Sequence, residues 1–382
     1  MAFGKKSAQE KALEVKFVRP AKMTGAAKAF LKTLQKKYET SKAPRKKNYI
    51  KSSSLKFNRI LGGGWLRGRV YEMFGPESGG KTTWALDAIA NAQRQYPDMG
   101  AFFVDVERSY DEERAAKLGV DVKAMGDPHV PENGDTAMDD VYDACMSGAF
   151  SVIVVDSVAG LETSEEVIAT VGETKNKVGQ SGRLMSVALK KIVRAAYVSD
   201  TAVIFINQMR DKPGEMFGPK ETTPGGRALK FYSSARIQVR ALSGAENKFL
   251  VSGEQVGHRI EMQVVKNKLG APYRKATMDL YYFAPLDTVS ELLELGIQNG
   301  VITNTGTTRK QVYAFNGKSI AEGEDELRKR LIEDHELRLQ VMAEIEKVFV
   351  QPSLTPDLSS EEELNVLEKE DSGEEGQHQN IL

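Results

Sequence analysis

From residue 55 to about residue 265, short apolar runs alternate with longer segments in which apolar residues recur every three or four positions. The short runs lack the polar alternation of a strand with one solvated face, so they predict strands that are buried on both sides. The expected strands are Val70–Phe74, Gly100–Val106, Ser151–Asp156, Ala202–Gln208 and Ile237–Ala241. Strands that alternate with helices predict an α/β fold with a mostly parallel sheet covered by helices on both faces.

Beyond Gly270 the pattern becomes a mixture of short strands and helices. Leu286–Gly296 has helical spacing, Thr305–Phe315 contains short strand candidates, and Leu327–Val350 is amphipathic. We therefore expect a small α+β C-terminal domain. The predicted parts of the chain are a basic N-terminal helical arm and linker at 1–54, a core at 55–284, the small domain at 285–351 and an acidic, disordered tail at 352–382.

The two ends of the chain carry opposite charge, although its 382 residues balance 53 Lys and Arg against 53 Asp and Glu. Residues 1–56 hold sixteen basic and three acidic residues, whereas residues 357–382 hold nine acidic residues and one lysine. A basic arm suits a polyanion or an acidic neighbouring surface, and an acidic tail can compete with that polyanion for basic sites. The alternative is that both ends are solvated segments that keep the protein soluble.

Cysteine and histidine are scarce in this chain. Cys145 is the single cysteine and the four histidines are scattered, so neither a disulfide framework nor a zinc site is indicated. The N-terminal region has no signal-peptide core, and no apolar run approaches the ~18 residues of a membrane span. We expect a cytoplasmic protein with no membrane role.

One motif indicates nucleotide chemistry. Residues 75–83 have the phosphate-loop pattern G-x-x-x-x-G-K-[ST] between an expected strand and an expected helix from Thr82 to Gln93. The N–H groups of such a loop wrap a polyphosphate, Lys81 can reach the outer phosphates, and the Thr82 hydroxyl can bind Mg²⁺. The candidate nucleotide-binding residues are Gly75, Pro76, Glu77, Ser78, Gly79, Gly80, Lys81, Thr82 and Thr83. An ordinary glycine-rich turn is the alternative.

Polar residues at the ends of neighbouring strands predict a hydrolytic site. Asp156 ends a buried strand and can hold Mg²⁺, or else cap a helix. Glu107 follows the expected strand Gly100–Val106. It is the candidate base for the attacking water, or else a surface carboxylate beside Arg108. Gln208 follows a third strand, where its amide can contact either the outer phosphate or the loop beyond.

Two stretches inside the core are expected to be irregular. Met209–Gly226 holds basic residues, three prolines and four glycines, which favours binding of single-stranded nucleic acid; a lid over the nucleotide is the alternative. Its candidate contacts are Arg210, Lys212, Gly225 and Gly226. Glu162–Lys177 precedes a helix that begins near Val178, and the charges of this helix form either a basic edge or a solvated face. The charged residues of that helix are Arg183, Lys190, Lys191 and Arg194.

These motifs resemble those of the bacterial RecA recombinase family over residues 55 to about 358. Five blocks occur in the family's order: Gly75–Thr83, Asp105–Asp111, Val152–Ser157, Phe205–Tyr232 and Val264–Lys268. The resemblance implies a RecA-type P-loop ATPase core that binds ATP and Mg²⁺. It also implies a helical filament on single-stranded DNA, which is paired with homologous duplex DNA so that strands are exchanged.

The resemblance also implies roles for single residues. Lys81 and Thr82 match the phosphate and Mg²⁺ residues, Glu107 the general base, Asp156 the second Mg²⁺ carboxylate, and Gln208 the residue that couples nucleotide to DNA. Lys266 and Lys268 match a pair that reaches ATP from the neighbouring protomer, so that assembly would gate hydrolysis. Ser186 and Lys190 match DNA-backbone contacts, Gly225 and Gly226 match backbone donors, and the two irregular stretches match the family's DNA loops.

The chain departs from the family at several positions. Arg114 stands where the family has a tyrosine that stacks on adenine, whereas Asp111 matches the residue that contacts the base. An arginine plane can also stack on adenine. The first DNA loop diverges strongly, and the second carries Pro213 and Glu215 at unexpected positions.

Two other functions remain open on the same motifs. One is a ring-shaped helicase on the same fold, and the other is a DNA-binding regulator that does not hydrolyse nucleotide. A long N-terminal arm favours head-to-tail addition of protomers and hence an open helix. Retention of Lys81, Glu107 and Asp156 favours hydrolysis.

Overall fold

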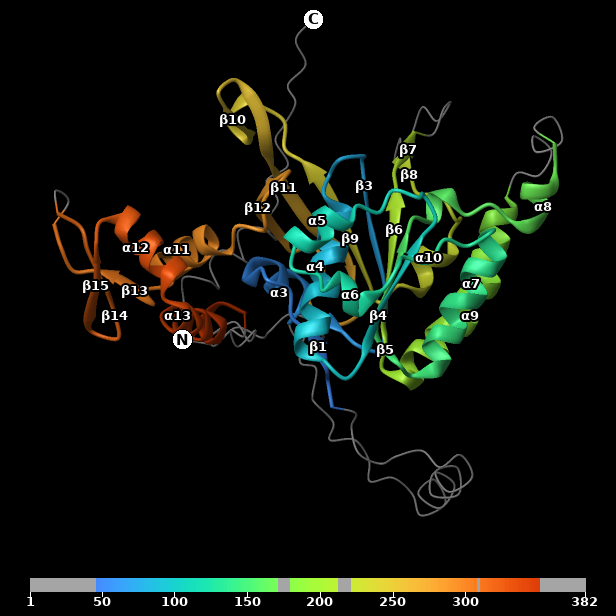
Figure 1. The fold of residues 1–382 in the computed structure, drawn as a ribbon, viewed down its shortest axis with the longest axis horizontal. Coiled ribbons are helices and arrows are strands. Elements are labelled where there is room, and N and C mark those ends of the chain that lie inside the picture. Colours follow the sequence, from blue (N-terminus) through green and yellow to red (C-terminus); the bar gives the residue numbers. More distant parts are fainter. Residues whose placement is uncertain (1–45, 171–178, 212–220, 308–309, 351–382) are drawn as a thin grey trace, which may run out of the picture. The chain divides into compact units, whose positions relative to one another are not determined.

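The computed structural model describes residues 46–170, 179–211, 221–307 and 310–350. Within these residues the main sheet has eight strands (Figure 1). They are β3 (Val70–Gly75), β4 (Gly100–Asp105), β5 (Phe150–Asp156), β6 (Ala202–Gln208), β9 (Ala235–Ala241), β10 (Lys248–Val251), β11 (Glu254–Asn267) and β12 (Lys275–Tyr281). All five strands predicted from the sequence are confirmed.

The strand order is β10-β11-β9-β3-β6-β5-β4, with β12 also paired to β11. The five strands from β9 to β4 are parallel, whereas β10, β11 and β12 are antiparallel to their neighbours. The parallel strands align their carboxyl ends at one edge, where Gly75 lies opposite Gln208 and Asp105 opposite Asp156. Such an edge is where ligands bind in open α/β sheets.

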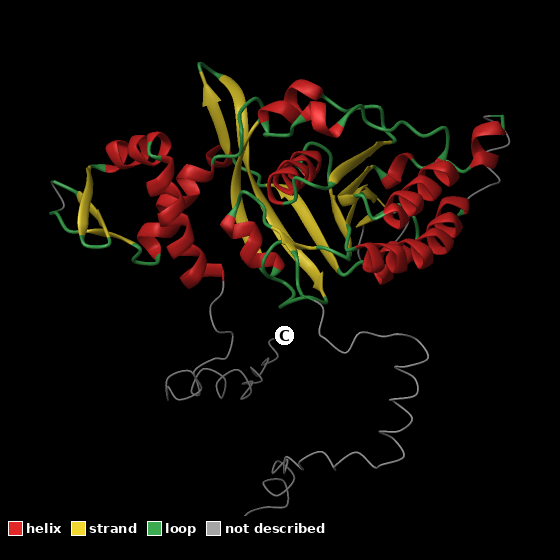
Figure 2. Cartoon of the chain, turned by 60° about the horizontal axis from the view of Figure 1, so that its bottom comes forward, coloured by secondary structure: helices red, strands yellow, loops and turns green. Residues whose placement is uncertain are grey.

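Helices cover both faces of this sheet, as predicted (Figure 2). Neighbouring residues of β5 show why: Val154 packs into one core cluster and Val155 into the other. Successive strand side chains point to opposite faces, so a continuous apolar run fits a sheet that is covered twice. One layer holds α3 (Leu55–Leu61), α4 (Lys81–Gln95), α5 (Glu112–Lys117) and α6 (Val122–Met125). The other holds α7 (Gly134–Ser147), α9 (Gln180–Ser199) and α10 (Ala228–Tyr232).

The C-terminal elements form a third core cluster around a three-stranded antiparallel sheet. They are α11 (Thr288–Gln298), β13 (Ile302–Asn304), β14 (Val312–Phe315), β15 (Lys318–Glu322), α12 (Glu324–Glu333), α13 (His335–Ile345) and η4 (Glu346–Val350). The amphipathic stretch at 327–350 is divided among α12, α13 and η4, of which α12 comes first. The helix stops at Asp334, whose side chain accepts the backbone N–H of Leu337 at 3.0 Å and so caps a new helix.

The two stretches expected to be irregular contain some regular structure in their described parts. Ser164–Ile168 forms helix α8, because Thr163 and Glu166 make a reciprocal capping box at its start. Arg210 pairs with Thr222 and Asp211 with Glu221 in a short antiparallel ladder of β7 (Arg210–Asp211) and β8 (Glu221–Thr222). The expectation of no regular structure is therefore wrong at the base of the second stretch.

Other short elements complete the description. They are β1 (Tyr49–Ile50), β2 (Trp65–Leu66), η1 (Val158–Gly160) and η3 (Ala245–Asn247). The structure does not describe residues 1–45, which hold most of the expected N-terminal arm. The acidic tail at 352–382, Lys212, Pro213 and Glu215 also lie outside the described residues. Among the residues that are described, no helix is both long and apolar enough to span a membrane.

Candidate nucleotide and DNA site

The phosphate loop joins β3 to α4, and its shape depends on two glycines. A Cβ on Gly75 would lie 1.9 Å from the carbonyl oxygen of Val239, so no other residue fits between β3 and β9. Gly80 has φ +89°, which a side chain disfavours, and it starts α4 without a side-chain cap. The N-cap residue therefore has no side chain that could accept the first N–H groups of α4. These N–H groups remain available to bind an anion.

Lys81 lies inside this loop. Its Nζ donates to the carbonyl oxygens of Pro76 at 2.6 Å and Gly75 at 3.2 Å. Burial lowers the pKa of this lysine, while the charges of Asp156, Glu107 and Glu77 oppose the shift. The loop thus holds a buried cation beside three carboxylates at the position where phosphates bind in P-loops.

Thr82 and Asp156 meet at the start of α4 and the end of β5. The Thr82 hydroxyl donates to Oδ2 of Asp156 at 2.6 Å. Burial raises the pKa of Asp156 to about 6, the hydrogen bond from Thr82 lowers it, and the charge of Glu107 raises it. A hydroxyl and a carboxylate in contact are hard oxygen donors of the kind that Mg²⁺ prefers, so this pair fits that ion.

Glu107 and Gln208 also come together at this edge of the sheet. Nε2 of Gln208 donates to Oε1 of Glu107 at 2.9 Å, and the Ser157 hydroxyl donates to the same oxygen. The strand ends of β4, β5 and β6 thus join the candidate base to the residue that precedes the DNA loop. Ser157 follows Asp156 in the sequence, but its contact with Glu107 was not predicted.

A cavity of about 380 Å³ opens beside the phosphate loop. It is lined by Ser78, Gly80, Lys81, Thr82, Thr83, Arg114, Leu280, Tyr281 and Tyr282. Arg114 extends from α5 and donates through Nη1 to Ala284 O at 2.8 Å and through Nη2 to Tyr281 O at 3.1 Å. Asp111 instead caps α5, because its Oδ1 accepts the N–H of Arg114 at 3.0 Å. Tyr281 and Tyr282 were not among the predicted site residues.

Lys266 and Lys268 lie beside the end of α10. Nζ of Lys266 donates to the carbonyl oxygens of Lys230 at 2.6 Å and Phe231 at 2.9 Å, at the end of α10. Nζ of Lys268 donates to Phe231 O at 3.4 Å. Neither lysine lines the cavity beside the phosphate loop of its own chain. The structure therefore separates these two cations from the other candidate catalytic residues.

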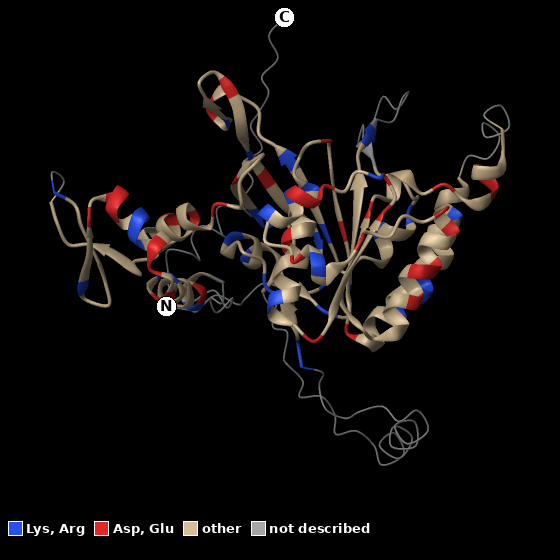
Figure 3. Ribbon diagram, viewed as in Figure 1, with Lys and Arg blue, Asp and Glu red and all other residues tan. Residues whose placement is uncertain are grey.

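Of the candidate DNA-binding residues, the two glycines Gly225 and Gly226 lie near the start of α9. Gly225 has φ +79°, and a Cβ added there would lie 2.8 Å from Val158 Cγ1. Gly226 packs on Gly182. Arg183 and Lys190 are exposed on α9, Ser186 is half-buried with its hydroxyl bound to Gly182 O, and Arg210 is exposed at the start of β7. The charged residues of α9 are all basic, whereas those of the neighbouring helix α7 are all acidic (Figure 3).

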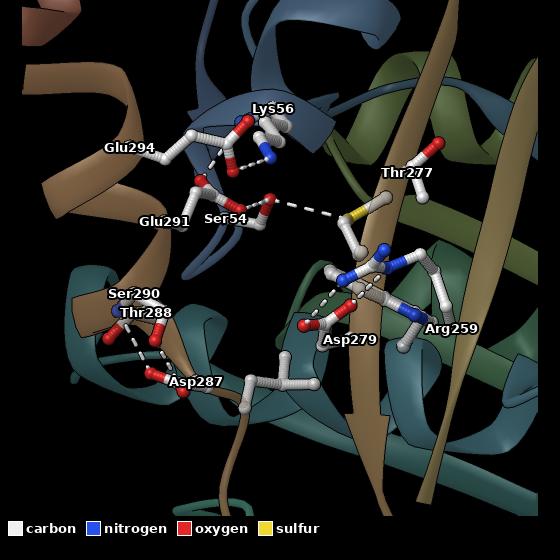
Figure 4. A pocket seen from close by; sticks show the side chains of 13 residues that line it. Ser54, Lys56, Arg259, Thr277, Asp279, Asp287, Thr288, Ser290, Glu291 and Glu294 are labelled. Carbon is white, nitrogen blue, oxygen red and sulfur yellow. Dashed lines mark hydrogen bonds and ion pairs between the residues drawn. The ribbon is translucent and has the colours of Figure 1, made fainter. Parts of the chain in front are cut away.

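A second cavity, of about 350 Å³, lies where the core meets α11 (Figure 4). The two cations at its wall are already paired, Lys56 with Glu294 at 2.6 Å and Arg259 with Asp279 at 2.8 Å. Glu291 accepts the Ser54 hydroxyl at 2.7 Å (Figure 4) and the Lys56 N–H at 3.1 Å. These contacts tie α11 to α3 within the compact unit that begins at Asn48.

Glu72 is a further residue that sequence reasoning missed. Its side chain is completely buried and accepts the amide of Asn207 at 3.0 Å. The signal in the sequence was a charged residue in the middle of the apolar run Val70–Phe74. A buried carboxylate of this kind requires partners, which the sequence cannot name.

Comparison with known proteins agrees with this geometry. The family model described as the RecA N-terminal domain matches residues 21–287. The chain belongs to the RecA family. Protein RecA of Thermus aquaticus is 42% identical over 323 residues, which cover 82% of this chain and 92% of that protein. Protein RecA of Aquifex aeolicus is also 42% identical, over 75% of this chain and 80% of that protein. Protein RecA of Staphylococcus carnosus is 40% identical, over 82% of this chain and 85% of that protein.

Membership of the RecA family defines the activity in general terms. RecA proteins are nucleotide-binding, DNA-dependent ATPases that assemble into filaments on DNA. This chain is accordingly a recombinase that promotes homologous strand exchange, and the RecA resemblance inferred from its motifs is confirmed. The predicted α/β core with a mostly parallel sheet is confirmed as well.

Proposed function

We propose that the nucleotide is ATP with Mg²⁺, bound at the edge of the sheet where β3, β4, β5 and β6 end. Gly75–Thr83 would hold the phosphates through backbone N–H groups and Lys81, and Arg114, Tyr281 and Tyr282 would surround the base. Thr82 and Asp156 would hold the Mg²⁺, which neutralises phosphate charge and so assists phosphoryl transfer.

Glu107 is the group that would act on the attacking water. Its Oε1 accepts hydrogen bonds from Gln208 and Ser157, which fix the carboxylate, while its second oxygen accepts none from the part of the chain that the structure describes. A carboxylate oriented in this way can accept a proton from water. Because Gln208 leads directly into Met209–Gly226, movement of the DNA loop would shift the hydrogen bond that orients Glu107.

Hydrolysis would be completed by the neighbouring protomer. Lys266 and Lys268 lie beside α10 rather than at their own phosphate loop, and two cations supplied across an interface would stabilise phosphoryl charge only after assembly. The filament would therefore be the active form of the ATPase.

On the DNA side we propose single-stranded DNA as the first partner and homologous duplex DNA as the second. Gly225, Gly226 and the exposed start of α9 would contact the strand, with Arg183, Ser186, Lys190, Arg210 and Lys212 as polar contacts. We also propose that residues 55–284 are the ATPase core and 285–351 the accessory domain, with 1–54 docking the neighbouring protomer.

The observation that carries this proposal is the Gln208–Glu107 hydrogen bond, because it links the base of the DNA loop to the hydrolytic carboxylate. The test is negative-stain electron microscopy on long single-stranded DNA, with and without a slowly hydrolysed ATP analogue. We expect regular helical filaments that require both ligands. Closed rings would instead support a helicase on the same fold.

The matching activity test uses Lys81→Ala. Loss of the buried cation should lower ATP turnover about 100-fold or more, because it removes an electrostatic contact to the phosphates. Lys117→Ala, on the exposed face of α5, is the control and should keep wild-type turnover. Undiminished turnover of Lys81→Ala in a highly purified preparation would show that the site lies elsewhere.

A further inference from the structure

Asn207 occupies an unusual position, because it contacts three functional regions with one buried amide. Its side chain is completely buried at the end of β6. Nδ2 donates to Glu72 Oε1 at 3.0 Å and to Pro224 O at 3.1 Å, and Oδ1 accepts the backbone N–H of Gln208 at 3.0 Å. Both amide hydrogens and the amide oxygen are therefore committed to partners.

Glu72 extends this set of contacts across the sheet. It lies in the centre of β3, opposite Arg236 of β9, and its second oxygen accepts the Arg236 Nε–H. The Arg236 guanidinium also packs over the Phe74 ring, with 4.3 Å from its carbon to the ring centroid. Arg236 is thus held from two sides, by a buried carboxylate and by an aromatic ring.

Arg236 in turn lies beside the lysines proposed to act in the neighbouring protomer. It is paired across the ladder with Lys266 of β11. Burial lowers the pKa of Lys266, the charges of Lys268 and Arg236 lower it further, and the charge of Glu72 opposes them. The electrostatic environment of Lys266 therefore depends on where the Glu72–Arg236 pair lies.

A buried ion pair of this kind contributes little net stability, since removal of its charges from water offsets their attraction. Its value is geometric, because a carboxylate with fixed partners holds those partners in place. Pro224 lies directly before the glycine pair Gly225–Gly226. A displacement of Pro224 by bound DNA must move or break its bond to Asn207, and the same amide holds Gln208 and Glu72.

We propose that Asn207, Glu72 and Arg236 form a buried relay that couples the DNA loop to both halves of the ATPase site. One branch runs from Pro224 through Asn207 to Gln208 in the same protomer. The other runs through Glu72 and Arg236 toward Lys266, which faces the next protomer. The three are positioning residues, and the assignment rests on the proposed roles of Gln208 and Lys266.

The first test is Glu72→Gln, which keeps the shape of the side chain but removes its charge. The Gln oxygen can still accept from Asn207, whereas its NH₂ group would face the Arg236 donor, so the second branch is disrupted selectively. ATP turnover is measured without DNA and at saturating single-stranded DNA, together with nucleotide affinity and thermal unfolding. We expect the stimulation by DNA to fall about tenfold, as for loss of a typical coupling free energy. Turnover without DNA and nucleotide affinity should stay within about twofold.

The matched control is Asp87→Asn. Asp87 is a buried carboxylate of α4 that accepts from Ser52 and Asn91 and touches neither the DNA loop nor β9 in the described hydrogen bonds. This variant reproduces the loss of a buried charge outside the relay, so its stimulation by DNA should remain that of the wild type.

A second variant, Arg236→Lys, keeps a positive charge near Glu72 but cannot donate through Nε, so it tests the relay even if Glu72→Gln fails to fold. It should lower the stimulation in the same way. Stimulation that is lowered only at subsaturating DNA and is normal at saturating DNA would overturn the coupling and leave the three residues as a support for the DNA loop. An equal fall in turnover without DNA would place these residues in the basal reaction, and unchanged stimulation in both variants would also overturn the proposal. Failure of the site assignment itself is detected separately, by Lys81→Ala.

Discussion

At the scale of single residues, Arg114 shows how a substitution can be compensated by its surroundings. Its two terminal nitrogens donate to the carbonyl oxygens of Ala284 and Tyr281, so the guanidinium is fixed at the wall of the cavity beside the phosphate loop. Burial lowers the pKa of this arginine, while the charge of Asp111 opposes the shift. A fixed planar cation at that wall can stack on a base, and it also holds the Tyr281–Ala284 segment in place.

Arg114→Ala should weaken nucleotide binding about tenfold, because it removes two charge-assisted hydrogen bonds and the planar surface. Equilibrium binding of ATP, measured alongside turnover at saturating ATP, separates this loss from an effect on chemistry. We expect the maximal turnover to change little. Lys117→Ala on the same helix controls for a lost positive charge, and equal affinities of the two variants would exclude a role for Arg114 at the base.

The phosphate loop and the residue-scale site were predictable to different degrees. Lys81 and Thr82 follow from a local pattern, since a strand, a loop and a helix start are adjacent in sequence. Asp156 was found separately, as the acidic residue that ends another apolar run. The partners of Asn207 and Glu72 could not be found in this way. Which buried polar groups meet depends on the register of β3, β6 and β9, and that register is a property of the whole sheet.

At the scale of elements, the junction between α3 and α11 depends on a buried acid. Glu291 on α11 is bound by the Ser54 hydroxyl and the Lys56 N–H (Figure 4). Burial is the largest cause that raises the pKa of Glu291, and the hydrogen bond from Ser54 opposes it. The ionised form is therefore less stable in the folded protein than in the unfolded chain.

This shift gives the junction a defined pH dependence. A raised folded-state pKa means that the contribution of Glu291 to stability is present below the ordinary carboxyl pKa and is lost as pH rises through the raised value. Glu291→Gln does not titrate, so the melting temperature of the variant relative to wild type should rise from acid toward neutral pH.

Thermal unfolding across that pH range measures the effect. Glu294→Gln is the control, because it removes a carboxylate from the same helix. The side chain of Glu294 is 48% exposed. A difference between Glu291→Gln and wild type that is the same at every pH would contradict the assignment.

The elements also show what a hydrophobic period leaves undetermined. Residues 327–350 have one amphipathic pattern, yet Asp334 ends α12 and caps α13. A 3.6-residue period marks which side chains are buried, but it does not register a change in helix direction between two segments with the same spacing. The antiparallel strands β10, β11 and β12 were not predicted, because the sequence was searched for continuous apolar runs. In β11 buried and exposed residues alternate, unlike the continuous apolar runs of the parallel strands.

At the scale of the whole molecule, the separation of Lys266 from Lys81 predicts complementation between inactive variants. Lys266→Ala protomers retain a phosphate loop, and Lys81→Ala protomers retain the two lysines proposed to act across the interface. In an equal mixture about a quarter of the interfaces would combine both, if protomers add head to tail at random. DNA-stimulated hydrolysis of the mixture should therefore reach about a quarter of the wild-type rate.

Each variant alone is the control, and electron microscopy must show that mixed filaments form. No recovery of hydrolysis in such filaments would exclude catalysis across the interface and place Lys266 in a structural role at the end of α10.

The position of the two lysines beside α10 has a consequence for filament ends. If each complete site takes its cations from the next protomer, a filament of n protomers has n − 1 complete sites. The protomer at one end then has no neighbour to complete its site and does not hydrolyse nucleotide. Turnover per protomer would then increase with the length of the DNA that the filament covers. A single protomer on a very short oligonucleotide would bind nucleotide without consuming it, so the protein would in effect measure the length of single-stranded DNA.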